Sequence, residues 1–546
     1  VAARIVEKVR VNPGNYADKK KFQQIEYTDL QYKEEIERIR DRFLPLVKIC
    51  KEYGTAMRIG TNHGSLSDRI LSRYGDTPIG MVESALEFLR ICEDEKYYNI
   101  VLSMKASNTQ VMVQAYRLLV QKLAEEGLKP YPLHLGVTEA GEAEDGRIKS
   151  AVGIGALLED GLGDTIRVSL TEDPEFEIPV ARALVDRYKT RTSDEYIHPI
   201  DVNPLHPFSY KRRSTSETSN IGAGNVPRVV IDLSHIQIFK YEELKNVGHV
   251  YNERLDKFNM TDQGADYVYC GDYSIPFMLP NGLREIVNYK VWQTLTNTIA
   301  RFPAIPYHDL NLLLKWHPTI NFVEIDASEI DLSLLHQFRE RNLVILLHTG
   351  QEHGMAAQRR FFIELINQGL DIPVILCRKY DALTEENFLL YASTDIGGLL
   401  IDGMGDGVML TWKHSLLDVW QSTGFLNRTS FGILQAARTR MTKTEYISCP
   451  SCGRTLFDLQ ETTAKIRART AHLKGVKIGI MGCIVNGPGE MADADYGYVG
   501  SGKGKITLYR GMNVVKRNVP SENAVDELIE LIREDGVWLE PQKMNG

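Results

Sequence analysis

Short apolar runs alternate with longer amphipathic stretches over residues 1–190. Between the first two runs, apolar side chains recur at helical spacing from Ile36 to Cys50. Thr28 and Gln31 form a capping box before this stretch and Gly54 follows its end, which is typical of the two ends of a helix. Repeated strand–helix units predict a parallel sheet. Its predicted strands are Val6–Val11, Ala56–Gly60, Asn99–Met104, Tyr131–Val137 and Thr165–Leu170.

Five such units fit either an open sheet or part of a barrel with eight strand–helix units. The chain starts at Val1 instead of Met and reaches an apparent strand within six residues. We therefore expect an α/β protein in which residues 1–195 are the C-terminal part of a TIM-type barrel, truncated at its N-terminus. A complete barrel would need three further β/α units.

Residues 196–228 are rich in Pro, Ser, Thr, Asn and Gly, which is typical of a loop or linker. A second strand–helix series follows, and we expect residues 229–435 to be an inserted, degenerate TIM-like domain. Its predicted strands are Arg228–Leu233, Asp266–Cys270, Phe322–Ile325, Leu343–Leu347, Val374–Cys377 and Leu399–Ile401.

The second series resembles a degraded copy of the first. GALLEDGLGDTI (Gly155–Ile166) parallels GLLIDGMGDGV (Gly398–Val408), and NIVLSMK (Asn99–Lys105) parallels NLVILLH (Asn342–His348). The separations agree, because Asp164 follows Lys105 by 59 residues and Asp406 follows His348 by 58. Matching offsets favour a duplicated barrel over chance similarity.

Polar residues stand where the strands of the first barrel end, which is the edge where TIM barrels carry their chemistry. Four cations and one carboxylate would meet there, which predicts a site for a phosphorylated ligand with a general acid. The second copy has His348 in place of Lys105 and Tyr380 in place of Glu139, so we expect it to keep the fold without the chemistry. The strand-end residues of the first barrel are Arg10, Asn12, Arg58, Asn62, His63, Lys105, Thr138, Glu139, Arg167 and Ser169.

Residues 440–546 form a third unit, predicted to be a small α/β domain with a cysteine motif. Cys449 and Cys452 form a C-x₂-C pair, Cys483 ends a predicted strand, and Glu490 follows it across a Gly/Pro turn. Thiolates in this pattern bind an iron–sulfur cluster or zinc. Three thiolates without a fourth suit a cluster with one distinct iron, to which Glu490 would add a weak oxygen ligand. The alternative is structural zinc, with Glu490 a surface residue of the turn.

Composition narrows the class of protein. The chain has 72 acidic and 64 basic residues, a formal charge of −8, which argues against bulk electrostatic binding of nucleic acid. No apolar run approaches the ~18 residues of a transmembrane helix, so we expect no membrane association, and no signal peptide is visible. Seven cysteines, an odd number, fit a reducing compartment. We therefore expect the cytoplasm, or the plastid stroma in a plant.

The motifs together resemble the 4-hydroxy-3-methylbut-2-enyl diphosphate synthase family, iron–sulfur enzymes of the non-mevalonate isoprenoid pathway. They are RVNPGN, RIGTNHGSLS, SMKAS, LGVTEAG, DGLGDTIRVSLTE, ISCPSCGRT and GCIVNGPGE. The insert resembles the three-domain form of plants and some bacteria. By this resemblance Glu139 is catalytic and the other strand-end residues bind substrate. The resemblance also implies that Cys449, Cys452, Cys483 and Glu490 ligate a 4Fe–4S cluster.

The activity that this resemblance implies is a reductive dehydration. It opens the ring of 2-C-methyl-D-erythritol 2,4-cyclodiphosphate to give 4-hydroxy-3-methylbut-2-enyl diphosphate, with two electrons entering and water leaving. Ferredoxin or flavodoxin is the implied donor, and the oligomeric state stays open. The cluster domain must close over the barrel mouth, and we expect the inserted barrel to be a spacer for closure within one chain. Two alternatives are a zinc-stabilised protein that binds phosphorylated ligands and a non-redox barrel lyase.

Overall fold

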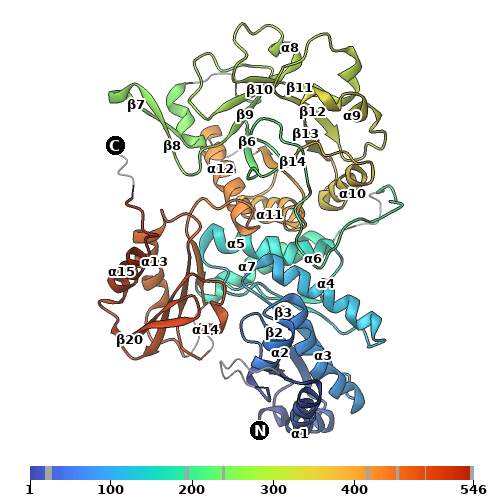
Figure 1. Cartoon of the computed structure of the whole chain (residues 1–546), viewed down its shortest axis with the longest axis vertical. Coiled ribbons are helices and arrows are strands. Elements are labelled where there is room, and N and C mark those ends of the chain that lie inside the picture. Colours follow the sequence, from blue (N-terminus) through green and yellow to red (C-terminus); the bar gives the residue numbers. More distant parts are fainter. Residues whose placement is uncertain are drawn as a thin grey trace. The chain divides into compact units, whose positions relative to one another are not determined.

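The computed structural model divides the chain into two compact units (Figure 1). It describes residues 1–18, 27–189, 191, 196–236, 240–413, 418–450, 454–485 and 487–541. Unit 1 combines Val1–Arg182 and Pro207–Ser209 with Lys443–Gly546, and unit 2 contains Ala183–His206 and Tyr210–Thr442. Segments from the two ends of the sequence therefore fold together in unit 1.

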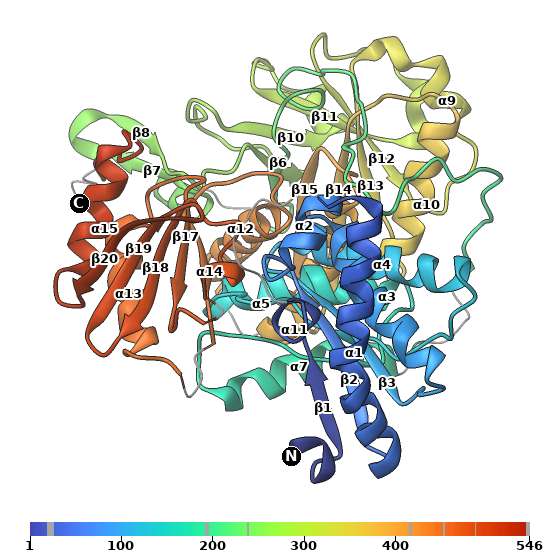
Figure 2. The ribbon, with the colours of Figure 1, turned by 60° about the horizontal axis from the view of Figure 1, so that its bottom comes forward.

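The first part of unit 1 is a series of parallel strands separated by helices (Figure 2). β1 pairs with β2, β2 with β3, and β4 with β5, and isolated parallel bridges join the segments of β3 and β4. All five predicted strands are present, and their carboxyl ends lie at one edge. The elements are β1 (Lys8–Val11), α1 (Asp29–Tyr53), β2 (Ala56–Asn62), α2 (Asp68–Tyr74), α3 (Pro78–Asp94), β3 (Ile100–Lys105), α4 (Thr109–Glu125), β4 (His134–Leu135), α5 (Ala143–Ser150), α6 (Ala156–Glu159), β5 (Thr165–Ile166) and α7 (Glu177–Lys189).

Helix α1 shows how the local sequence builds this layer. The Thr28 side chain accepts a hydrogen bond from the backbone N–H of Gln31, and the Gln31 side chain reaches back, so the predicted capping box is confirmed. Gly54 ends the helix in the left-handed conformation at φ 69°. The predicted apolar face of α1 buries Ile39 and Phe43 completely, which fixes the helix against the neighbouring elements.

The second part of unit 1 is a five-stranded sheet in the order β16-β17-β18-β19-β20. The first three strands are parallel and the last two pairings are antiparallel. Helices α13 and α15 share an apolar core with one face of this sheet (Figure 2). The elements are β16 (Glu445–Ser448), α13 (Leu459–Thr470), β17 (Lys477–Met481), α14 (Gly487–Glu490), β18 (Tyr496–Gly502), β19 (Lys505–Arg510), β20 (Asn513–Pro520) and α15 (Ala524–Glu534).

Unit 2 is a closed barrel of eight parallel strands, which confirms the predicted TIM-like insert. Every barrel strand pairs with its sequence neighbour among the barrel strands, and β15 returns to pair with β6. Its elements are β6 (Arg228–Asp232), β7 (His249–Asn252), β8 (Lys257–Met260), β9 (Tyr267–Gly271), β10 (Arg284–Asn288), α8 (Tyr289–Trp292), β11 (Arg301–Pro306), β12 (Asn321–Asp326), α9 (Ser333–Gln337), β13 (Leu343–His348), α10 (Gly354–Asn367), β14 (Val374–Asp381), α11 (Glu385–Ile401), β15 (Gly407–Lys413) and α12 (Val419–Ala436).

One predicted strand of this barrel is wrong. Leu399–Ile401 forms the last turn of helix α11, not a strand. All residues of this helix from Ala392 to Ile401 are buried, so its apolar side chains do not show the one-sided spacing of a surface helix. A continuous apolar run of this kind does not distinguish a buried helix from a buried strand.

The repeat between the two barrels extends to individual hydrogen bonds. In unit 1, the backbone N–H of Asp164 donates to the carbonyl of Leu133 at 2.9 Å, and the Asp164 carboxylate accepts from the Leu133 N–H at 2.7 Å. In unit 2, Asp406 makes the same two contacts with Val374, at 2.7 and 3.0 Å. These are the aspartates that the sequence repeat aligns, so both barrels keep one turn at the amino end of a strand.

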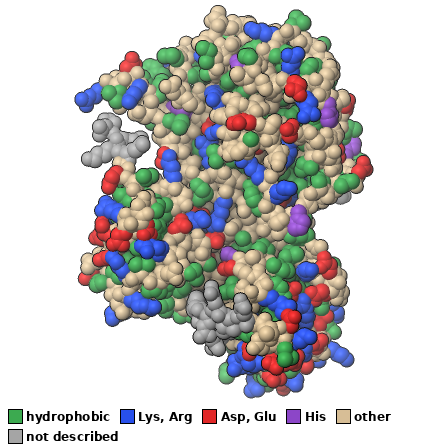
Figure 3. Space-filling model, viewed as in Figure 1, with side chains coloured by type: hydrophobic (Ala, Val, Ile, Leu, Met, Phe, Trp, Pro, Cys, Tyr) green, Lys and Arg blue, Asp and Glu red, His purple; other side chains and the backbone are tan. Residues whose placement is uncertain are grey.

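Most surface charges of the first helices have partners of opposite sign. Arg40 on α1 lies 2.5 Å from Asp94, and Arg90 on α3 lies 2.6 Å from Glu126. Acidic and basic side chains are intermingled over this region in the lower part of Figure 3. Within the described ranges, no helix combines the length and the apolar character needed to cross a bilayer.

Candidate functional site

Arg10 lies near the carboxyl end of β1 and reaches across Gly60 of the neighbouring strand β2. The guanidinium of Arg10 crosses β2 and donates to Asn62 Oδ1 at 3.0 Å and to the carbonyl of Gly60 at 3.3 Å. A Cβ on residue 60 would lie 3.0 Å from Arg10 Nε and 2.7 Å from Ser103 Oγ. Gly60 therefore leaves the space through which Arg10 reaches its position.

Four cations share this edge without a carboxylate partner. Arg10, Arg58, Lys105 and Arg167 form no ion pair within the described part of the chain. Burial and the charges of Arg10 and Arg167 lower the pKa of Arg58, and its buried Nε has no hydrogen-bond partner among the described residues. Unpaired cations held this close together are costly unless an anion joins them, and the anion site stays a prediction.

The loops after β1 and β2 place the neutral members of the predicted set. Asn12 Nδ2 donates to Ser65 Oγ at 3.2 Å, which ties the two loops together. Asn62 turns its amide oxygen toward Arg10. His63 Nε2 lies 3.4 Å from a carboxylate oxygen of Asp76, so its ring is held by the loop that precedes α3.

Glu139 is the buried carboxyl group of the site. It is 4% exposed, and its Oε2 has no hydrogen-bond partner among the described residues. Burial, with a further contribution from Glu490, raises the pKa of Glu139 well above its ordinary value. A hydrogen bond from Thr138 lowers this pKa but does not cancel the rise. Its backbone is left-handed at φ 49°, a strain that residues other than glycine accept mainly at functional positions. A buried carboxyl group with a raised pKa thus lies beside the cations. Ser169 is buried after the next strand.

The cysteines of the C-terminal sheet lie at the carboxyl ends of adjacent strands. Cys449 follows β16 and Cys483 follows β17, and these strands pair in parallel through Ser448 and Ile480. Both cysteines are partly exposed, and Cys449 Sγ accepts a hydrogen bond from the N–H of Gly482 at 3.3 Å. Cys452 lies outside the described residues. Among the described side chains alone, no three His, Cys, Asp or Glu residues have the geometry to hold a metal ion.

Glu490 brings the C-terminal sheet into the electrostatic field of the barrel mouth. It ends α14 and is partly buried. Burial raises the pKa of Glu490, while the charges of Arg10, Arg454 and Arg167 lower it. Glu490 in turn raises the pKa of Glu139. The charge of Glu490 therefore acts on the Glu139 carboxyl group within unit 1.

Contacts beside both cysteine motifs hold this arrangement. Thr171 Oγ1 lies 2.6 Å from Ser448 Oγ, immediately before Cys449. Gly64 in the loop after β2 meets Gly489, and a Cβ on residue 64 would lie 1.9 Å from the Gly489 carbonyl oxygen. The two loops thus approach backbone to backbone, which only residues without a side chain allow.

Buried polar pairs add to these contacts. Lys149 of α5 and Glu445 of β16 form an ion pair at 2.8 Å, with both side chains at least nine-tenths buried. The sequence motifs gave no sign of a role for Lys149, Glu445, Thr171 or His134, although His134 lies 3.2 Å from the Lys105 ammonium. One indication of this pair is visible in the sequence: Lys149 is a charged residue in an otherwise apolar segment, and such a residue needs a partner when it is buried.

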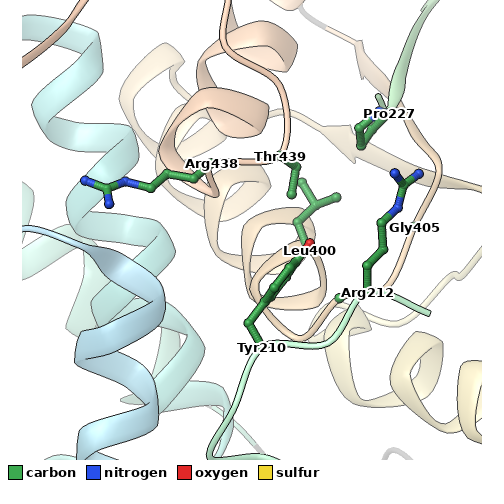
Figure 4. Close-up of a pocket in the computed structure, with 8 residues that line it drawn as sticks. Tyr210, Arg212, Pro227, Leu400, Gly405, Arg438 and Thr439 are labelled. Carbon is green, nitrogen blue, oxygen red and sulfur yellow. The ribbon is translucent and has the colours of Figure 1, made fainter. Parts of the chain in front are cut away.

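A cavity of about 100 Å³ lies elsewhere, in unit 2. It opens near the amino ends of β6 and β15, where Pro227 and Gly405 line it. Figure 4 shows Tyr210, Leu400 and Thr439 grouped at this cavity. Its Arg212 is paired with Asp406 at 3.0 Å, so this arginine supports the aspartate turn. The cavity contains none of the predicted site residues.

Known proteins match both parts of unit 1 and the insert between them. Residues 1–182 match the GcpE TIM-barrel domain, and residues 445–534 match the GcpE protein C-terminal domain. The chain is 48% identical to the 4-hydroxy-3-methylbut-2-en-1-yl diphosphate synthase (flavodoxin) of Parabacteroides distasonis, over 98% of this chain and 84% of that protein. The corresponding enzyme of Leptospira interrogans is 45% identical, over 99% of this chain and 84% of its own length. The 4-hydroxy-3-methylbut-2-en-1-yl diphosphate synthase (ferredoxin), chloroplastic, of Arabidopsis thaliana is 43% identical, over 99% of this chain and 76% of its own length.

Proposed function

This chain belongs to the 4-hydroxy-3-methylbut-2-en-1-yl diphosphate synthase family, and from this premise we propose roles for its residues in the family's reaction. The enzyme opens 2-C-methyl-D-erythritol 2,4-cyclodiphosphate to 4-hydroxy-3-methylbut-2-enyl diphosphate, with two electrons and two protons entering and one water leaving. The observation that carries the proposed roles is the interaction of Glu490 with Arg10, Arg167 and Glu139 across unit 1.

The cations of the barrel mouth hold the diphosphate before and after ring opening. Opening the ring frees one end of the diphosphate and adds negative charge to it. The unpaired charges of Arg10, Arg58, Lys105 and Arg167 stabilise that charge as it develops. Asn12, Asn62, His63, Thr138 and Ser169 line the same edge and orient the substrate.

Glu139 supplies the proton for the departing hydroxyl group. Its raised pKa favours the protonated form of the carboxyl group, which is the form that a general acid needs. When the proton leaves, the new carboxylate faces Arg167 and Lys149, and these charges stabilise it. The strained backbone holds the group at the mouth instead of letting it turn toward solvent.

The C-terminal sheet is the place for a 4Fe–4S cluster, with Cys449, Cys452, Cys483 and Glu490 as ligands. The described donors fit such a group, because two partly exposed thiols lie at adjacent strand ends and a backbone N–H already donates to one sulfur. When bound, a cluster supplies electrons one at a time. Glu490, which is partly buried among arginines, would supply an oxygen ligand beside the three thiolates.

Flavodoxin or ferredoxin is the proposed electron donor, since relatives of this chain carry one or the other in their names. A cytoplasmic location is a further prediction, and rests on the odd number of cysteines.

Iron and sulfide analysis of anaerobically purified protein tests the cofactor. We expect about four irons and four sulfides per chain, the content of a 4Fe–4S centre. Cys483→Ala should lower both, whereas Cys92→Ala, at a buried cysteine on α3, should leave both unchanged. A colourless protein with one zinc and no sulfide would contradict the proposal.

A further inference from the structure

The head of Lys105 is held by a histidine that the proposed roles leave out. Lys105 ends β3 and is 6% exposed. Its Nζ lies 3.2 Å from Nε2 of His134 on β4, and Nδ1 of His134 lies 2.8 Å from Oγ1 of Thr165 on β5. Three adjacent strands therefore contribute one residue each to a single hydrogen-bonded line.

The chemistry of the three groups fixes the direction of these bonds. An ammonium group donates and does not accept. When Lys105 carries its proton, Nε2 of His134 accepts from it, which leaves the ring proton on Nδ1, where it donates to the Thr165 hydroxyl. The Thr165 hydroxyl accepts from this tautomer and so holds the ring in the orientation that receives Lys105.

The backbone around His134 is also fixed. Tyr116 on α4 donates its hydroxyl to the carbonyl of His134 at 2.5 Å. Two residues further along, a Cβ on residue 136 would lie 2.8 Å from Lys105 Nζ. Gly136 therefore keeps open the space that the lysine head occupies beside His134.

The charges around this line make a neutral partner useful. Lys105 faces Arg10 of β1, Arg58 of β2, Arg167 after β5, and the Glu139 carboxyl group after β4. Burial and the three arginines lower the pKa of Lys105 to about 7. Burial, followed by the charges of Lys105, Arg58, Lys8 and Arg167, lowers the pKa of His134 to about 3, so the ring stays neutral. A carboxylate at position 134 would neutralise the ammonium, whereas a neutral imidazole orients it and leaves its charge for the substrate.

We propose that His134, aligned by Thr165, is a positioning residue that aims the Lys105 ammonium at the diphosphate of the substrate. This inference rests on the proposed role of Lys105 as a diphosphate ligand. It adds that substrate binding draws a proton onto Lys105, because an anion beside the group favours its charged form. His134 itself makes no contact with the reacting atoms in this proposal.

Binding of inorganic pyrophosphate and of the cyclodiphosphate to the full chain, measured by titration calorimetry, tests the positioning role. We expect His134→Phe to weaken both about tenfold, to raise KM by a similar factor and to leave kcat within about threefold, because alignment of a ground-state ligand is lost. His134→Gln, which retains an acceptor, should recover most of the affinity. Calorimetry in buffers of different ionisation enthalpy should show proton uptake near pH 8 for the wild type and less for His134→Phe.

Further variants separate the possible failures. If His134→Phe does not fold, Thr165→Val against Thr165→Ser asks the same question, because only serine retains the hydroxyl that bonds to Nδ1 and holds the ring. Wild-type affinity in both His134→Phe and Thr165→Val would overturn the inference. Wild-type affinity in Lys105→Met would instead overturn the proposed role of Lys105, and with it the premise.

Discussion

At the scale of single residues, the site depends on groups whose pKa values the fold has moved. Burial and Glu490 raise the pKa of Glu139, and burial and three arginines lower the pKa of Lys105 to about 7. Opposite shifts of an acid and a base within one pocket are typical of catalytic sites. Two predictions follow from these shifts.

Replacing Glu139 with Gln removes the transferable proton and keeps the shape of the side chain. We expect kcat to fall by about 10²–10⁴-fold, the usual contribution of a general acid, with substrate affinity within about threefold of wild type. Steady-state kinetics with a chemical reductant and calorimetric binding measure the two effects. Glu52→Gln, at an exposed position on α1, serves as the control. A kcat near that of the wild type would show that another group delivers the proton.

Replacing Lys105 with Met should stabilise the protein that carries no ligand. The pKa of Lys105 is about 7 in the fold and about 10.4 in an unfolded chain. Between these values the unfolded state binds the proton and the folded state does not, so wild-type stability rises with pH across this window. Lys105→Met should therefore raise the melting temperature at pH 6 and raise it less at pH 9. The exposed Lys48→Met variant should show no such trend, and an equal shift at both pH values would contradict the burial of a charged lysine.

Sequence reasoning identified the chemical types of these residues but not their states. Arginine, lysine and glutamate at strand ends are visible in the chain, and the parallel topology brings strand ends together. The shifted pKa of Glu139 depends on Glu490, which lies 351 residues further along the chain. His134 was missed because a lone histidine in an apolar strand reads as part of the core.

At the scale of elements, two loops decide whether the C-terminal sheet reaches the barrel mouth. The loop after β2 and the turn that forms α14 meet at Gly64 and Gly489. A side chain at either position occupies space that the other backbone already fills. This contact therefore connects a structural requirement with the position of Glu490, one residue beyond Gly489.

Gly64→Ala should separate these loops. The new Cβ would lie 1.9 Å from a carbonyl oxygen, so one loop must move and carry Glu490 away from Arg10. We expect activity to fall at least about 100-fold, the scale on which small misplacements reduce catalysis, with iron content unchanged.

Gly54→Ala provides a matched control for backbone strain. Its φ is 69° against 78° at Gly64, but a Cβ there meets nothing within 4 Å. We expect this variant to lose about 1 kcal/mol of stability and to keep its activity. Equal activity loss in both variants would mean that strain, and not the contact with Gly489, is the cause.

The elements themselves were predicted best where the local sequence is self-sufficient. The capping box of α1 and the five strands of the first barrel part were visible in the sequence, because caps and apolar periodicity act over a few residues. Strands β10, β11 and β15 were missed, and the end of α11 was mistaken for a strand. In these segments burial on all sides removes the periodicity that identifies an element.

At the scale of the whole molecule, one chain contains both halves of the site. Unit 1 draws on residues before and after the inserted barrel, and its buried pair Lys149–Glu445 joins the halves at 2.8 Å. The role of the insert as a spacer for closure within one chain stays a prediction.

Mixing two defective chains tests closure within one chain. A Cys483→Ala chain lacks a cluster ligand and a Glu139→Gln chain lacks the proton donor. We expect their mixture to show no more activity than the two separately, because each active site draws both halves from the same polypeptide. Restoration of a substantial fraction of wild-type activity would show that sites form between chains and would contradict the spacer role.

The aspartate turn is common to the two barrels, whereas the residues at the carboxyl ends of their strands differ. Asp164 and Asp406 accept hydrogen bonds at the amino ends of strands. Lys105 in one barrel and His348 in the other lie at the opposite, carboxyl ends of strands. Residues at the amino ends of the strands thus maintain the fold, and residues at the carboxyl ends determine which ligand binds. The second barrel keeps the aspartate turn but has different residues at the carboxyl ends of its strands. Binding of a new ligand can therefore arise on this barrel without loss of folding stability.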